Sequence, residues 1–119
     1  MKNKISFCYK YKFDKEGKYT IKIIFKKPLI NINYLFYECN KLLSIDLSNF
    51  NTNNVTDMYS MFSDCSSLTS LDLSNFNNKK VINMSHMFDN CFALRKINFI
   101  FINIYYTIIF NFFFIIFSF

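Results

Sequence analysis

The chain has 119 residues, which is enough for one domain with a modest hydrophobic core but not for two. It contains 17 Phe and 8 Tyr but one Gly and one Pro, and its net charge is +6 at pH 7. The single glycine, Gly17, excludes a glycine-rich phosphate-binding loop, and the single histidine, His86, excludes a histidine cluster.

The first 28 residues are a basic segment. They hold nine lysines against two acidic residues, a net charge of +7, whereas the rest of the chain has a net charge of −1. Apolar residues alternate with polar ones on both sides of a turn at 14–17, and Pro28 follows. The alternating residues are Phe7, Tyr9, Tyr11 and Phe13, then Tyr19, Ile21, Ile23 and Phe25. This pattern predicts a β-hairpin over residues 1–28 that caps the structure, with one aromatic and one lysine-rich face.

The lysines of this segment would suit an anionic surface such as nucleic acid or acidic lipid. We prefer a simpler interpretation, a hairpin whose lysines are solvated, and we expect no nucleic-acid partner. The positive charge at the N-terminus is not followed by a continuous apolar run, so no secretory signal peptide is visible. Taken literally, the sequence begins in the cytosol.

A repeat of 26 residues organises the middle of the chain. Residues 46–51, Asp-Leu-Ser-Asn-Phe-Asn, recur unchanged at 72–77. The same shift preserves six apolar positions through three copies: Leu29, Ile32, Leu35, Phe36, Cys39 and Leu42; Val55, Met58, Met61, Phe62, Cys65 and Leu68; Val81, Met84, Met87, Phe88, Cys91 and Leu94. We therefore predict repeat units at about 29–45, 46–71 and 72–98.

Each unit contains two different apolar spacings. Residues 68–73 end in an apolar–polar alternation, which predicts a short strand. Residues 55–62 carry apolar side chains at i, i+3, i+6 and i+7, which predicts a short helix with Asn54 as its N-cap. One such unit cannot bury its own apolar stripe, so neighbouring units must stack on it.

Stacking would place equivalent residues in columns that run from unit to unit. The expected columns are Ile45–Leu71–Ile97 in the strands, Phe36–Phe62–Phe88 in the helices and Asn49–Asn75 at the turn. An asparagine repeated at a turn can donate its amide hydrogens to the backbone of the adjacent unit.

Residues 46–71 closely resemble the repeat of the BspA-like leucine-rich-repeat surface proteins. The signature is Asn-Val-Thr-Asp-Met-x-x-Met-Phe at 54–62, followed by Cys-Ser-Ser-Leu at 65–68. The resemblance covers roughly residues 29–99 and weakens in the third unit, at 79–80 and 92–93. It implies a right-handed solenoid, a role in adhesion or recognition of a protein or cell-surface ligand, a membrane-associated or cell-surface location, and no enzymatic activity.

Residues 99–119 form an uncharged hydrophobic tail dominated by Phe and Ile. Its length suits a transmembrane span, with Arg95 and Lys96 on the cytoplasmic side. Its β-branched and aromatic content would also suit a β-rich C-terminal cap. A third interpretation is a translated A/T-rich stretch that replaces lost repeats. The sequence leaves all three open.

The side chains that usually carry chemistry are sparse. Cys39, Cys65 and Cys91 share one repeat position, and we expect them to stack as buried free thiols because a disulfide could pair only two of the three. Without a Cys-x-x-Cys motif or an interleaved histidine, we expect no zinc site. His86 lies between apolar positions, and we expect it to face solvent, without a partner in its column and without a catalytic or metal-binding role.

These patterns together predict an α/β fold. It is a short leucine-rich-repeat-like solenoid of about three coils, each with a strand and a short helix, over residues 29–98. The hairpin at 1–28 would cap it and the tail at 99–119 would follow it.

The predicted function is a non-catalytic module for protein–protein interaction or surface adhesion, without a cofactor or a metal. Its expected contact face consists of exposed strand-side residues from two units: Ser44, Asp46, Ser48, Ser70, Asp72 and Ser74. The aspartates recur because the repeat recurs, not as an acid–base pair. Two alternatives stay open: a truncated repeat remnant with little binding function, and a membrane-anchored protein whose repeats are a spacer.

Overall fold

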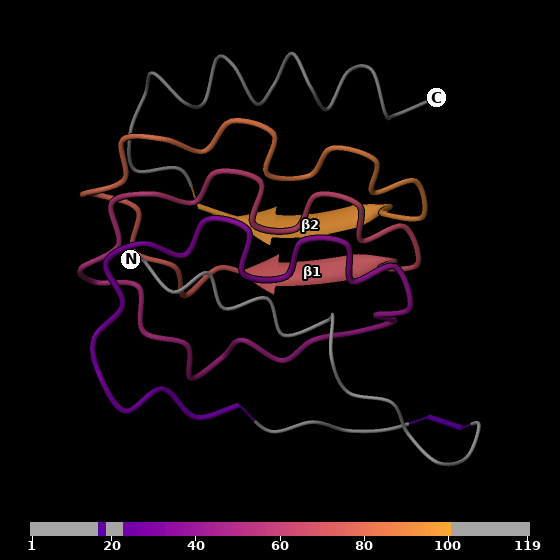
Figure 1. Cartoon of the computed structure of the whole chain (residues 1–119), viewed down its shortest axis with the longest axis horizontal. Coiled ribbons are helices and arrows are strands. Elements are labelled where there is room, and N and C mark those ends of the chain that lie inside the picture. The colour runs from indigo at the N-terminus through magenta and orange to yellow at the C-terminus, as the bar shows by residue number, and fades with distance from the viewer. Residues whose placement is uncertain (1–16, 19–22, 101–119) are drawn as a thin grey trace.

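The computed structural model describes residues 17–18 and 23–100, in which the repeat units lie as successive layers (Figure 1). Two strands are present in this part of the chain, β1 (Ser70–Leu73) and β2 (Lys96–Phe99). They form a parallel two-stranded sheet in which Ser70 is paired with Lys96 and Leu73 with Phe99. The predicted period of 26 is therefore the register of the sheet.

The alternation of side chains explains why these residues form strands. In β1, Leu71 and Leu73 are buried while Ser70 and Asp72 are exposed, as the two-residue period of a strand requires. The predicted pairing of Leu71 with Ile97 is confirmed. Ile45 was expected in the same column, but residues 44–48 are not a strand, and no backbone hydrogen bond between described residues joins them to β1.

The helix predicted in each unit is wrong. Residues 32–39, 58–65 and 84–91, called the turn ribbons below, are consecutive turns, and the described residues contain no helix. Each ribbon has two residues with positive φ, among them Ser60 at 50° and Asp64 at 64°. A right-handed helix cannot contain such residues. The expected α/β solenoid with a helix in every coil is thus overturned, and with it the N-cap role of Asn54.

Backbone hydrogen bonds show how a turn ribbon is stabilised. Alternate N–H groups point to the next unit: Ser60 N donates to Ser85 O at 3.0 Å and Phe62 N to Met87 O at 3.0 Å. Other N–H groups close tight turns within the ribbon, as Met61 N does to the oxygen of Met58 at 3.2 Å. Such turns bring apolar side chains inward every three or four residues, which is also the spacing of an amphipathic helix.

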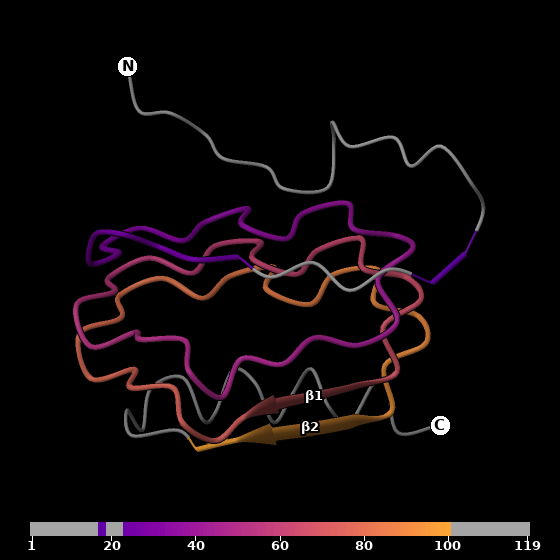
Figure 2. The same cartoon turned by 90° about the horizontal axis from the view of Figure 1, so that it is seen from below.

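The core lies between the strand side and the turn ribbons, which occupy opposite broad sides of the molecule (Figure 2). Phe62 is fully buried, and its ring stacks on Phe36 at 5.2 Å and on Phe88 at 5.9 Å, with interplanar angles of 18° and 15°. The predicted phenylalanine column is confirmed. The repeated apolar positions of the second unit are all buried: Val55, Met58, Met61, Phe62, Cys65 and Leu68.

Most of both predicted end segments lies outside the described residues. Of the hairpin expected at 1–28, only residues 17–18 and 23–28 are described, and none of these is in a strand. Of the tail at 99–119, only Phe99 and Ile100 are described, and Phe99 ends β2 rather than beginning a new segment. Within residues 17–18 and 23–100, no helix is long and apolar enough to cross a membrane, so a transmembrane helix finds no support there.

Candidate interaction surface

The six residues predicted as a contact face are all exposed on the strand side: Ser44, Asp46, Ser48, Ser70, Asp72 and Ser74. They surround an open hollow between the first and second units. Four of them line it, together with Ile45, Leu47 and Asn75: Asp46, Ser48, Asp72 and Ser74. The hollow lies where residues 44–48 run past β1 without backbone pairing.

Local turns hold the two carboxylates in equivalent positions. Ser48 N donates to Asp46 Oδ1 at 2.9 Å, and Ser74 N donates to Asp72 Oδ1 at 2.9 Å, because the same tripeptide forms the same turn twice. The backbone hydrogen bond from Ser48 holds the pKa of Asp46 below its usual value. Side-chain and then backbone hydrogen bonds from Ser74 lower the pKa of Asp72. Both groups are therefore carboxylates at neutral pH.

Asn75 joins the first two units at the wall of the hollow. Its Nδ2 donates to Leu47 O at 3.0 Å and to Ser48 O at 2.9 Å, which confirms the predicted amide-to-backbone contact. Asn49, the equivalent residue of the preceding unit, instead donates to Ser48 Oγ at 3.4 Å. Asn75 thus provides a polar link where the strand ladder is interrupted.

Two further residues extend this face into the third unit. Lys96 is exposed and pairs in register with Ser70, and Asn98 Nδ2 donates to Asp72 Oδ2 at 3.3 Å. Sequence reasoning missed both, although a shift of 26 from Ser70 and Asp72 leads directly to them. The strand-side face, as the term is used below, comprises the six predicted residues with Lys96 and Asn98.

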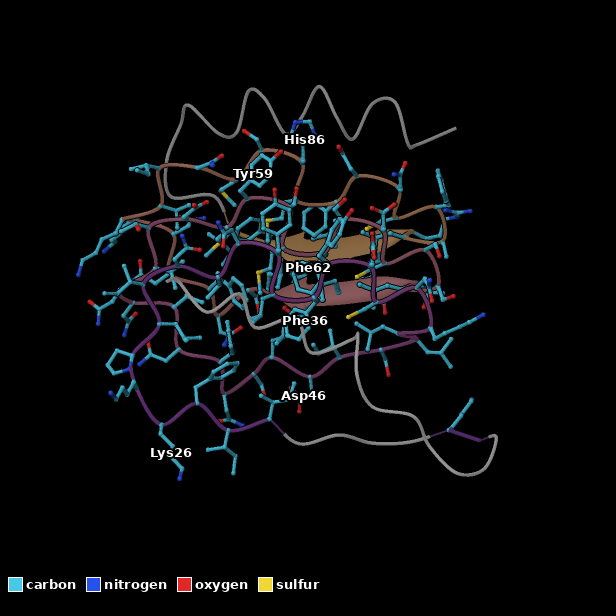
Figure 3. The ribbon with its side chains drawn as sticks, viewed as in Figure 1. Lys26, Phe36, Asp46, Tyr59, Phe62 and His86 are labelled. Carbon is cyan, nitrogen blue, oxygen red and sulfur yellow. The ribbon has the colours of Figure 1, made fainter. Side chains whose placement is uncertain are left out.

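The turn side carries a row of rings that the sequence did not reveal. His86 is exposed, as expected, but it has two partners: its Nδ1 pairs with Asp89 Oδ2, and its ring packs edge-on against Tyr59 at 5.5 Å (Figure 3). Tyr59 in turn contacts Tyr34 at 5.3 Å. The expectation that His86 has no partner is wrong. Tyr34 and Tyr59 are 25 residues apart, the offset of the backbone bonds between ribbons, so a search at 26 does not find them.

The cysteine column contains two free thiols. Cys65 and Cys91 are buried, and each donates its Sγ–H to a carbonyl of the preceding unit at 3.1 Å, to Phe36 O and Phe62 O respectively. Burial raises the pKa of Cys65 to about 12 and that of Cys91 to about 11. These thiols stay protonated and are poor nucleophiles.

Cys39 departs from the expectation of a free thiol, because it is buried but disulfide-bonded. Since Cys65 and Cys91 are free, its disulfide does not lie within the column. The sequence argument considered pairing within the column alone. In the part of the chain that the structure describes, no group of three or more His, Cys, Asp or Glu side chains could hold a metal ion.

The molecule is thus a repeat protein of parallel stacked units with polar residues in columns on its strand side. Residues 10–101 match the family described as "Mycoplasma protein of unknown function, DUF285", and the chain belongs to this family. Comparison with curated proteins and with solved structures gave no match.

Proposed function

We propose that the chain is a non-catalytic interaction module that binds a protein or cell-surface ligand through its strand-side face. One observation carries the proposal: six exposed polar side chains from two repeat units are held side by side around an open hollow. Serine hydroxyls can both donate and accept hydrogen bonds, and ionised aspartates accept them. The face therefore suits a partner with exposed backbone amides or polar side chains.

The rigidity of the face supports a binding role. Hydrogen bonds from Ser48 and Ser74 fix the two aspartates, and Asn75 fixes the distance between units. A face ordered before binding loses less conformational entropy when a partner docks. The resemblance of residues 46–71 to the BspA-like repeat adds a second support, because it implies adhesion or recognition.

The test is a binding assay with the full chain. Fluorescently labelled protein is titrated onto immobilised cell-surface protein, before and after protease treatment of that surface. We expect saturable, protease-sensitive binding that is at least tenfold weaker for Ser44→Arg/Ser70→Arg. The matched control is Asn40→Arg/Ser85→Arg, which places the same two exposed arginines on the turn side. Absence of saturable binding, or equal loss in both double variants, would refute the proposal.

A further inference from the structure

A continuous row of aromatic rings crosses all three units on the turn side. Tyr37 contacts Tyr34 at 5.4 Å, Tyr34 contacts Tyr59 at 5.3 Å, and Tyr59 contacts His86 at 5.5 Å, all edge to face. The three tyrosines are half-buried and His86 is exposed, so the row lies at the surface rather than in the core. We call these four residues the tyrosine row.

The surroundings of the tyrosine row are acidic, although the protein as a whole is basic. Residues 31–41, 57–67 and 83–93 contain four carboxylates, Glu38, Asp57, Asp64 and Asp89, against the single Lys41. Their net charge is −3 with neutral His86, whereas the whole chain carries +6. Asp89 pairs with His86 within the row. This face therefore attracts cations in spite of the net charge of the chain.

The row is presented on a fixed backbone. Tyr34 and His86 both have positive φ, 58° and 59°, which is uncommon for bulky residues. The Tyr34 N–H donates to Tyr59 O at 2.9 Å, so the hydrogen bonds that join the ribbons also set the spacing of the rings. Tyrosine has few rotatable bonds, and a ring held in this way loses little entropy on binding.

We infer that the tyrosine row binds a peptide segment that bears arginine or lysine side chains. A guanidinium or ammonium group is attracted to the face of a tyrosine ring, and the adjacent carboxylates add charge-assisted hydrogen bonds. Tyrosine and arginine are also the residues that contribute most at protein interfaces. This surface is separate from the strand-side face, because the two lie on opposite broad sides (Figure 2), and Asp46 is far from Tyr59 and His86 in Figure 3.

The experiment uses the full chain and a fluorescein-labelled octa-arginine peptide at physiological salt, with fluorescence anisotropy as the readout. Octa-glutamate and a neutral Gly-Ser octapeptide are the controls. We expect octa-arginine alone to bind. Replacing one ring should weaken binding about fivefold for Tyr59→Leu, whereas Tyr59→Phe keeps the ring face and should stay within about twofold.

Two charge variants separate a local site from general electrostatics. Asp89→Asn removes a carboxylate beside the tyrosine row and should weaken octa-arginine binding, by about threefold if an exposed contact is lost. Asp72→Asn makes the same change in net charge on the strand-side face and should leave the affinity unchanged. Thermal unfolding of each variant checks that it is folded, and Tyr37→Leu, at the end of the row, replaces Tyr59→Leu if that variant unfolds.

Three results would overturn the inference: no binding of octa-arginine, equal weakening by Asp72→Asn and Asp89→Asn, or unchanged binding after loss of a ring. None of them bears on the strand-side face. The serine-to-arginine variants of that face should still bind octa-arginine, so the two proposals fail separately.

Discussion

Replacing Ser60 by glycine and by alanine would show which backbone the repeat adopts. Ser60 has φ of 50° in the second turn ribbon. A helix would make the glycine variant less stable than the alanine variant by about 1 kcal/mol. At positive φ the order is opposite, since alanine is disfavoured there by about 1–2 kcal/mol and glycine is not.

The magnitude depends on burial, and the same ribbon supplies a control. Ser60 is 5% exposed, so the buried methyl of alanine returns up to about 0.8 kcal/mol. We therefore expect Ser60→Gly to exceed Ser60→Ala by about 0.5–1 kcal/mol. Ser63 is also 5% exposed but is not among the residues with positive φ. There the methyl and the backbone entropy both favour alanine, by about 1–1.5 kcal/mol.

The assay is urea unfolding of the four single variants in the full chain, with the free energy of unfolding taken by linear extrapolation. Comparing glycine with alanine at each site cancels the loss of the serine hydroxyl. The expected difference between the two sites is about 2 kcal/mol, well above the error of such extrapolations. If alanine is favoured over glycine equally at both sites, the turn ribbon is incorrect and a helix is restored.

Three further predictions concern the polar link, the thiols and the carboxylates. Asn75→Ala should lower the free energy of unfolding by about 1–2 kcal/mol, because two carbonyls lose their donor, whereas Asn49→Ala should stay within about 0.5 kcal/mol; equal effects in denaturant titrations would contradict the bridging role. Cys65 and Cys91, whose pKa values are raised to about 12 and about 11, should react with a chromogenic disulfide reagent at pH 8 only after unfolding, and fast native reaction would contradict their burial. The pKa of Asp72 is lowered on folding, so its stabilisation is present above its unfolded pKa of about 3.9 and disappears as pH falls through the folded value. Asp72→Asn should therefore lose less stability than the wild type between pH 6 and about pH 2.5, and equal acid sensitivity would contradict this assignment.

The register of the fold could be predicted from the sequence because a repeat fixes which residues become neighbours. Leu71 pairs with Ile97, and Phe62 stacks between Phe36 and Phe88, whatever backbone connects them. Burial follows from the same argument, since each repeated apolar residue must be covered by its counterpart. The amide of Asn75 is a polar instance of the same rule.

The local backbone could not be predicted, because two structures share one apolar spacing. Turns closed by i+3 hydrogen bonds and a helix both bring Met58, Met61 and Phe62 to one side. What separates them is a positive φ at Ser60 and Asp64, and neither residue type demands that conformation strongly enough to be recognised from sequence. Stacking decides the outcome, because the ribbon gives its N–H groups to the next unit, whereas a helix keeps them to itself.

The contact face was predictable and its hollow was not. Ser70, Asp72 and Ser74 are exposed because strand residues alternate, and the repeat copies them into the first unit. The hollow, however, depends on residues 44–48 failing to pair with β1, which no pattern in those residues announces.

The contrast between columns argues for where recognition can vary. In the core, Phe36, Phe62 and Phe88 are identical because each must fit the ring beside it. At the surface, one position of the turn ribbons holds Tyr34, Ser60 and His86, all with φ between 50° and 59°. The backbone there is the same in every unit while the side chain is different, so stacking does not dictate the residue. The turn side can therefore acquire new rings and charges without disturbing the core, whereas strand-side changes remain constrained by the pairing of β1 with β2. Measuring octa-arginine and cell-surface binding on the same Tyr59→Leu and Ser44→Arg/Ser70→Arg proteins tests this division directly. Each change should abolish or weaken one activity and spare the other, and a parallel loss of both would mean that the two faces are not independent.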